Sequence, residues 1–225
     1  MVDVRLLAIA LAAIAGFVDA VGYLSLGGQF VAHMTGDTSR LGQHLGLAQL
    51  EAALPPAVAV VAFVVSVALG TLLVGGGRSG LCRALALEAA LLAPAAIYGG
   101  TLCRHGVVPR SDAGYWVVLP AVVAAMGVQS AIALSWRSET LRTTFLTGML
   151  TRLGRTVAEL ATSGPGGERR RDGPQALLIV AVWAAFVGAG AGGALLLGRW
   201  QLWSLSVPLA AVVLLAGACA HGVDV

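Results

Sequence analysis

Long apolar stretches dominate this chain and are separated by short polar segments. Six of these stretches hold about 20 mostly apolar residues, the length that an α-helix needs to cross the hydrocarbon core of a bilayer. They cover residues 6–26, 57–77, 81–102, 115–136, 176–198 and 202–220. The pattern therefore predicts an all-α, polytopic transmembrane helical bundle of six spans, in which residues 1–225 form a single membrane domain.

The ends of these stretches carry the signals expected at helix ends and at a membrane surface. Pro55 and Pro56 precede the second stretch and Pro174 precedes the fifth, which predicts helix starts because proline is tolerated in the first turn. Tryptophans are typical of the membrane–water interface, and four lie at the predicted ends: Trp116, Trp136, Trp200 and Trp203. The first stretch resembles a signal peptide, but its apolar run continues past the cleavage-like residues, so we expect it to be retained.

Composition excludes the common soluble classes. Of the 225 residues, 58% are hydrophobic and only 11% are charged, and the mean hydropathy is +0.87. Soluble domains carry about 25% charged residues. A soluble globule of this composition would have to expose large apolar patches, which such proteins avoid. We therefore exclude a cytosolic enzyme and a nucleic-acid-binding domain, and expect the lipid bilayer as the partner.

The distribution of basic residues predicts the orientation in the membrane. All 14 are arginine, and six spans place ten of them on the side of the N-terminus. Because cytoplasmic loops are enriched in basic residues, both termini are predicted to be cytoplasmic, in the inner membrane of a bacterium. Residues 164–174 (GPGGERRRDGP) are predicted to form a cytoplasmic hairpin, whose arginines set the topology or alternatively contact lipid headgroups.

An internal repeat organises the chain. The sequence TGxxxRLG occurs at Thr35 and again at Thr147, 112 residues later. Further matches link residues 16–20 (GFVDA) to 127–131 (GVQSA), and the AFV at 62–64 with Gly70 to the AFV at 185–187 with Gly193. We interpret residues 1–103 and 112–221 as duplicated units.

The number of spans decides how the two units are related. With three spans each, the second unit enters the membrane in the reverse direction, giving the inverted repeat of many secondary transporters. If both TG segments cross the membrane, the protein has eight spans and parallel halves. The six-span arrangement keeps the sharper asymmetry of arginine, so it is preferred.

The TG segments carry most of the polar chemistry. Drawn as helices, both have a face of small residues. The first also has a polar stripe of His33, Asp37, Arg40 and His44, of which the second keeps only the arginine. Charges at membrane depth persist where they pair or line a wet cavity. We therefore expect Gly27 and Gly28 to form a hinge, and the stripe to face a polar path. The alternative is an amphipathic helix at the membrane surface.

Two acids, Asp19 and Glu88, lie inside predicted spans. Glu88 has several interpretations, namely a partly wetted or snorkelling acid, a partner of Arg83, or a protonatable site. Acids that change protonation inside a membrane commonly couple transport to protons. The candidate substrate or ion pathway comprises Asp19, His33, Thr35, Gly36, Asp37, Arg40, Glu88, Thr147, Gly148 and Arg152.

The chain shows no pattern for a metal or for catalysis. Cys82, Cys103 and Cys219 have no CxxC or metal-ligand spacing. Cys82 and Cys103 lie at opposite ends of one predicted helix, about 30 Å apart at 1.5 Å per residue, so they cannot bridge each other. We expect all three to be small buried hydrophobic residues. The GxSxG, HExxH and P-loop motifs do not occur, so no cofactor and no enzymatic activity are predicted.

The two motifs together resemble a known family. GFVDAVGYLSLGGQFVAHMTGDTSRLG near the N-terminus and LRTTFLTGMLTRLG at mid-chain are similar to the YoaK-like family of uncharacterised bacterial multi-pass membrane proteins. This resemblance implies an inner-membrane protein without an assigned activity. Members have a TGN-type motif, where this chain carries Asp37.

These features favour a small transporter or permease for an unknown solute or ion. Asp19 and Asp37 would carry a proton or cation, while Arg40 and Arg152 would bind or gate. One alternative is a membrane-embedded enzyme acting on a lipid or quinone, with His33 and Asp37 as an acid/base pair. The other is a scaffold or sensor that associates through small-residue helix faces.

Overall fold

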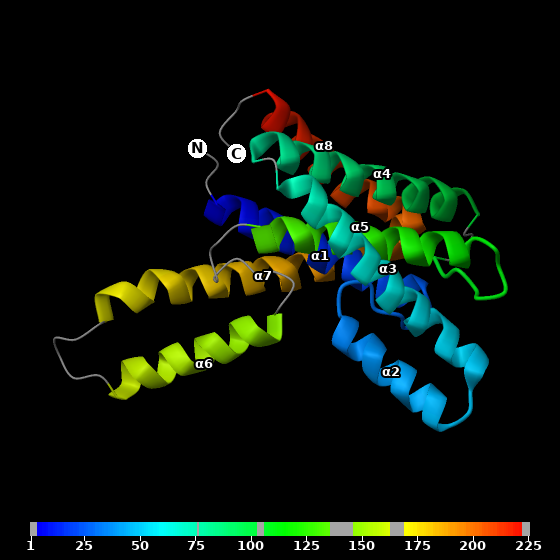
Figure 1. Cartoon of the computed structure of the whole chain (residues 1–225), viewed down its shortest axis with the longest axis horizontal. Helices are drawn as coiled ribbons and strands as arrows, with labels where there is room; N and C mark the ends of the chain where they lie inside the picture. Colours follow the sequence, from blue (N-terminus) through cyan, green and yellow to red (C-terminus); the bar gives the residue numbers. More distant parts are fainter. Residues whose placement is uncertain (1–3, 76, 103–105, 136–145, 163–168, 222–225) are drawn as a thin grey trace.

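A computed structural model describes residues 4–75, 77–102, 106–135, 146–162 and 169–221, and its regular structure is helical throughout these ranges (Figure 1). The helices are α1 (Val4–Ser25), α2 (Met34–Gly46), α3 (Leu50–Val74), α4 (Arg78–Leu102), α5 (Tyr115–Ser135), α6 (Leu146–Thr162), α7 (Arg169–Trp200), the 3-10 helix η2 (Gln201–Leu205) and α8 (Ser206–Ala220). The all-α prediction is confirmed.

Five segments are long and apolar enough to cross a membrane. They are Val4–Ser25, Leu50–Val74, Arg78–Tyr98, Tyr115–Ser135 and Gln175–Ala220. The last has 46 residues and contains most of α7 together with η2 and α8. Neither TG helix, α2 or α6, is among these candidate spans, so the fold is a bundle of apolar helices with two shorter, more polar ones.

Two predicted helix starts were wrong. α3 begins at Leu50, so Pro55 and Pro56 lie inside the helix rather than before it. α7 begins at Arg169, so the second half of the predicted hairpin is helical, while residues 164–168 lie outside the described part. Proline near a helix start frees carbonyl groups of the first turn, which meet solvent at a helix end and so cost little.

Close helix packing is made at glycines. α1 packs mainly on α7, and α3 packs mainly on α5. A Cβ atom on Gly16 of α1 would overlap the backbone carbonyl of Phe186 in α7. On Gly127 of α5 it would overlap the side chain of Ser66 and lie 2.9 Å from the carbonyl oxygen of Phe63 in α3. Small residues at such crossings let helices approach closely inside a membrane.

The residues at these contacts are the ones that match between the two halves of the sequence. Gly16 corresponds to Gly127, and Phe186 corresponds to Phe63, so aligned residues make the same type of contact twice. In each case, the first helix of one half packs against the helix that follows the TG segment of the other half. The two halves therefore exchange equivalent partners across the bundle.

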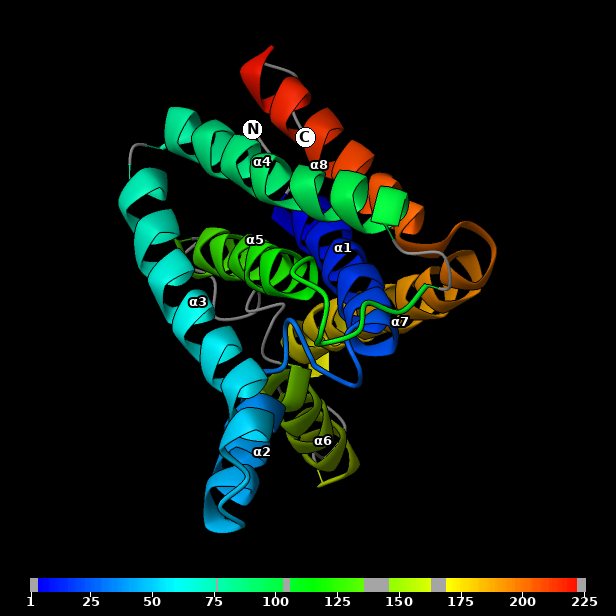
Figure 2. The same ribbon diagram turned by 90° about the vertical axis from the view of Figure 1, so that its right-hand side faces the viewer.

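The two TG helices lie on the same side of this bundle in both views (Figures 1 and 2). Each packs on the helix that follows it, α2 on α3 and α6 on α7. In Figure 1, α2 and α6 begin near the middle of the long axis and run outward in opposite directions. Figure 2 shows α1 at the centre of the bundle, among α4, α5, α7 and α8.

One cysteine prediction was wrong. Cys82 and Cys219 form a disulfide, with their Cα atoms 5.7 Å apart, although 137 positions separate them in the sequence. The packing of α8 on α4 brings the start of one helix to the end of the other, a proximity that spacing along the chain cannot reveal. The guanidinium of Arg78 also donates to the carbonyl of Cys219 at 2.8 Å. Cys103 lies outside the described residues.

Candidate functional site

Asp19 is the centre of a polar cluster in the otherwise apolar helix α1. Only 6% of the surface of Asp19 is exposed. One carboxylate oxygen, Oδ1, accepts hydrogen bonds from the backbone N–H groups of Val31 and Ala32 at 3.1 and 2.8 Å. The other, Oδ2, lies 2.8 Å from Nδ1 of His33. Three donors from the segment before α2 therefore compensate the burial of this acid, as a charge in such a place requires.

A glycine turn brings that segment back along α1. Gly27 and Gly28 have φ values of +64° and +78°, a left-handed conformation that glycine adopts without the steric cost other residues incur. The turn follows Leu26 and returns the chain to the level of Asp19. The guanidinium of Arg40, in α2, donates to the carbonyl of Gly28, which ties α2 to the turn. The glycine pair predicted as a hinge therefore forms a chain reversal that positions the cluster.

Asp37, in the first turns of α2, is completely buried. The side-chain amide of Gln29 donates to its Oδ1, and its Oδ2 has no hydrogen-bond partner within the described ranges. Burial raises the pKa of Asp37 from 3.8 to about 7, although the nearby charge of Arg40 opposes this rise. The carboxyl group therefore changes protonation close to neutral pH.

His33 connects the cluster to aromatic side chains. Its hydrogen bond with Asp19 is the main reason why the pKa of His33 lies above its ordinary value of 6.5, with burial acting in the opposite direction. The imidazole side chain is 39% exposed. Its ring lies 5.5 Å from the ring of Phe30 and 5.9 Å from that of Phe186, measured between centroids. It can therefore exchange a proton with its surroundings while it remains bonded to Asp19.

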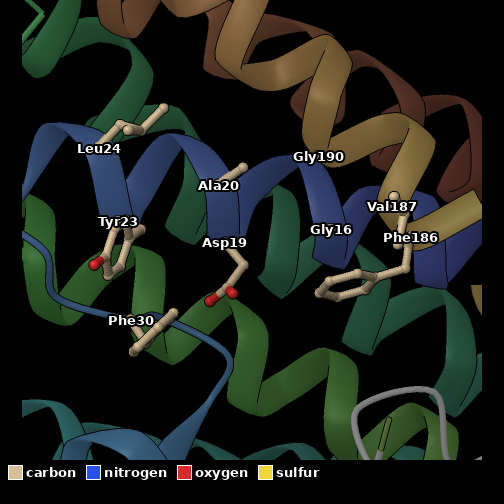
Figure 3. A pocket seen from close by; sticks show the side chains of 9 residues that line it. All are labelled: Gly16, Asp19, Ala20, Tyr23, Leu24, Phe30, Phe186, Val187 and Gly190. Carbon is tan, nitrogen blue, oxygen red and sulfur yellow. The ribbon is translucent and has the colours of Figure 1, made fainter. Parts of the chain in front are cut away.

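A pocket of about 260 Å³ opens beside this cluster, between α1 and α7. It is lined by Asp19, by the rings of Tyr23, Phe30 and Phe186, and by small or aliphatic residues of both helices. Figure 3 shows Tyr23, Asp19 and Phe186 projecting on the same side of α1, with Phe30 of the returning loop beside them. The pocket thus combines one carboxylate with three aromatic residues.

The start of the second TG helix packs on the same two long helices. Met149, in the first turn of α6, belongs to a buried apolar cluster with Ala8 and Ala12 of α1 and with Ile179 and Val182 of α7. From Ala12, the pocket begins four residues further along α1, which is about 6 Å at 1.5 Å per residue. Along α1 and α7, the contact with the start of α6 therefore comes first, and the pocket and the loop before α2 follow it.

Comparison with known proteins assigns the chain to a family. Residues 7–218 match the family described as protein of unknown function, DUF1275. The chain belongs to this family. The DUF1275 chain is also similar to the UPF0700 transmembrane protein YoaK of Bacillus subtilis (strain 168), with 31% identity over 144 residues, which cover 62% of this chain and 60% of that relative. No solved structure matches it. Together with the apolar helices, these findings support a multi-pass membrane protein.

In this DUF1275 member, some of the predicted site residues come together. Asp19, His33, Asp37 and Arg40 lie in or around one cluster, as described above. Gly36 packs beneath Phe30, whose ring would be 3.1 Å from a Cβ atom placed there. The pairing predicted for an enzyme differs from the observed one, because His33 bonds to Asp19 while Asp37 bonds to Gln29.

Other predicted residues lie elsewhere. Thr35, Thr147 and Gly148 are exposed at the starts of α2 and α6, and Arg152 is half-buried in α6. Glu88 is fully buried in α4, and within the described part of the chain its carboxylate oxygens have no hydrogen-bond partner. α4 packs on α5, α8, η2 and α3 rather than on α2, so Glu88 does not join the Asp19 cluster.

Sequence reasoning missed the residues that complete the site. Gln29 was overlooked although it is a polar residue in the short apolar segment GGQFVAH. The aromatic lining was also missed, because Phe186 reaches the pocket from a helix more than 150 positions away from Tyr23 and Phe30. Among the described residues, no group of His, Cys, Asp or Glu side chains is arranged to hold a metal ion.

Proposed function

We propose that this protein is a small-solute or ion transporter of the bacterial inner membrane. The observation that carries the proposal is a buried, hydrogen-bonded carboxylate, Asp19, inside an apolar candidate span and at the wall of an open pocket. Ionisable residues within such helices are costly and mark substrate or ion pathways. A scaffold that works by helix association needs neither this carboxylate nor the pocket.

The repeated contacts support an inverted-repeat architecture with six spans. Aligned glycines of the two halves make equivalent helix crossings, and the 46-residue apolar segment contains two α-helices separated by η2. The TG helices begin near the middle of the molecule and run in opposite directions (Figure 1). Half-helices of this kind, starting beside a central site, are typical of secondary transporters.

Protonation supplies a means of coupling. Asp37 titrates at about 7, and the pKa of His33 lies above 6.5. Asp37 therefore changes charge within the pH range across which a bacterial inner membrane maintains a gradient, and the hydrogen bond with Asp19 favours the protonated form of His33. With both termini in the cytoplasm, as the arginine distribution predicts, α2 would run toward the outer side of the membrane. The Asp19 cluster would be the site where solute and proton meet.

Flux measurements on the reconstituted full chain test this proposal. The protein is placed in liposomes that enclose a pH-sensitive dye, a potassium diffusion potential is imposed, and small ammonium, carboxylate and neutral solutes are added in turn. We expect at least one solute to cause proton movement in the wild type. Asp19→Asn should lower the rate about tenfold or more, since it removes the charge that the pathway requires.

Matched variants separate the pathway from general effects. Glu51→Gln changes an exposed carboxylate at the start of α3 and should leave the rate unchanged. Arg40→Gln and Arg152→Gln test the two arginines that the TG segments share. Unchanged flux in Asp19→Asn, Arg40→Gln and Arg152→Gln, or no flux with any solute class, would contradict the proposal.

A further inference from the structure

The pocket between α1 and α7 has an unusual chemical lining. Three aromatic residues, Tyr23, Phe30 and Phe186, line the space, the rings of Tyr23 and Phe30 lie 4.7 Å apart between centroids, and Asp19 is the one charged residue in its wall. The remaining lining residues are glycine or aliphatic. Aromatic faces are the negative ends of ring quadrupoles, so they and the carboxylate favour the same sign of charge in a ligand.

We propose that this pocket binds a small organic ammonium ion, with the cationic nitrogen between the Asp19 carboxylate and the aromatic faces. The inference deepens the proposed transport function and rests on it for its physiological role, because it names the class of solute. Aromatic rings around a carboxylate are a general way of recognising amines and quaternary ammonium groups. An anionic solute would be repelled by both components.

The volume of the pocket limits the size of the ligand that it can hold. A volume of about 260 Å³ is below the range of roughly 300–1,000 Å³ that is common for sites of drug-sized molecules. A compact amine therefore fits, whereas a large lipophilic cation does not. Gly16 and Gly190 line this space, and at both positions an added Cβ would meet the facing helix.

Asp19 retains the capacity to bind such a ligand. Its Oδ1 already accepts two backbone hydrogen bonds, but its Oδ2 has one partner, Nδ1 of His33. A carboxylate oxygen accepts about two hydrogen bonds, so Oδ2 keeps one free position. A primary ammonium group can donate to this oxygen, while a quaternary one makes only the electrostatic contact.

The ligand competes with the positive form of His33. The charged groups around this imidazole are Asp19 from α1 and Asp37 and Arg40 from α2, and α7 presents the ring of Phe186. A second positive charge beside Asp19 disfavours the imidazolium, so binding releases one proton from His33 to solvent. The elevated pKa of His33 is consistent with this exchange. An ammonium ion and a proton would thus occupy the Asp19 site alternately.

Calorimetry on the full chain in detergent tests the inference with phenyltrimethylammonium as the probe. Its neutral isostere, tert-butylbenzene, has the same shape without the charge, and benzoate carries the opposite charge. We expect binding of the ammonium ion only. Phe186→Leu should weaken it about tenfold, the effect of losing one well-placed cation–π contact. Phe63→Leu changes the matched residue of the other half and should have no effect.

The proton provides an independent measurement. Titrations at neutral pH in buffers of different ionisation enthalpy should show release of up to one proton per ligand, and this release should vanish in His33→Gln. Binding should also be weaker at pH 5.5 than at pH 8. Asp19→Asn removes the anion and also replaces one of the two oxygens that accept hydrogen bonds from Val31, Ala32 and His33, so Phe186→Leu remains decisive if that variant does not fold.

Several results would overturn the inference. These are absence of ammonium binding, equally tight binding of tert-butylbenzene, preference for benzoate, or equal losses in Phe186→Leu and Phe63→Leu. The outcome is separable from the transport test. Ammonium binding without flux would refute transport and leave the ligand class standing, whereas flux of another solute without ammonium binding would refute the ligand class alone.

Discussion

Replacing the buried acid of α2 should make the protein more stable at neutral pH. Asp37 is fully buried, and its pKa is about 7 instead of 3.8. A raised pKa means that the folded state binds the proton more tightly than the unfolded state. The stabilisation from this proton is therefore complete below about pH 3.8 and is lost as the pH rises to about 7. Above that pH the folded protein carries a buried, poorly paired charge.

The size of the stability gain follows from the change in the pKa of Asp37. At 1.36 kcal/mol per pH unit, the difference between 3.8 and about 7 corresponds to an upper limit of about 4 kcal/mol. Water that enters the site and the screened charge of Arg40 reduce this value, so we expect Asp37→Asn to be about 2 kcal/mol more stable than the wild type at pH 7.5. For a chain of this size that is about 4–8 °C in Tm. The asparagine can still accept the hydrogen bond from Gln29.

Thermal unfolding of the purified protein, followed by tryptophan fluorescence from pH 4.5 to 8.5, measures this effect. The Tm of Asp37→Asn should exceed that of the wild type only slightly near pH 4.5 and by a larger margin at pH 7.5. A smaller loss of stability above pH 6.5 should remain in the variant, because the raised pKa of His33 stabilises the fold only while its imidazole is protonated.

A matched change separates burial from net charge. Glu51→Gln removes an exposed carboxylate and should leave the pH dependence of the wild type intact. Our account of Asp37 fails if Asp37→Asn is less stable than the wild type at pH 7.5. It also fails if the Tm of that variant varies with pH as steeply as the wild type does between pH 4.5 and 6.5.

Two further predictions concern packing and the disulfide. Gly16→Val and Gly127→Val should each lower stability by about 3 kcal/mol or more, because the added atoms meet a neighbouring helix and overpacking strains a close contact. Gly188→Val, where no atom lies within 4 Å of the added Cβ, should lower Tm much less, and equal losses would contradict the packing. Thiol tagging of the air-oxidised, SDS-denatured protein should label one of the three cysteines before reduction and all three after it. Labelling of three before reduction would exclude the bond between Cys82 and Cys219.

The apolar pattern predicted most of the helices because bilayer thickness fixes their length. α1 and α5 begin and end within a few residues of the predicted spans. Local signals were less reliable at helix starts. Pro55 and Pro56 were interpreted as marking a boundary, but α3 continues through them, since an early turn tolerates the loss of hydrogen bonds.

The candidate site was predictable only in part. The acid of the first span and the polar stripe of the first TG segment identified Asp19, His33 and Asp37. Which groups pair was not predictable, because the Gly27–Gly28 reversal decides that His33 meets Asp19. The position of Phe186 in the pocket was also not predictable, since it depends on how α7 crosses α1.

The two halves of the sequence carry matching glycines at helix crossings but differ in their polar residues. Where the first half has Asp19 and Asp37, the aligned residues of the second are Ser130 and Met149. Ser130 bonds to the carbonyl of Met126 in its own helix, and Met149 packs in an apolar cluster, so neither adds a charge to the interior. A second buried acid near the first would cost several kcal/mol through desolvation and repulsion.

This cost explains why a duplicated fold would keep a single set of acids. The crossings at Gly16 and Gly127 depend on small residues, which both halves can carry without penalty. The cluster at Asp19 depends on burying charge, which is tolerable once, where the reversed loop supplies three donors. In a transporter of this design, the repeated contacts would provide two similar packing states. The polar cluster at Asp19, which only the first half carries, would define one binding site that both packing states share.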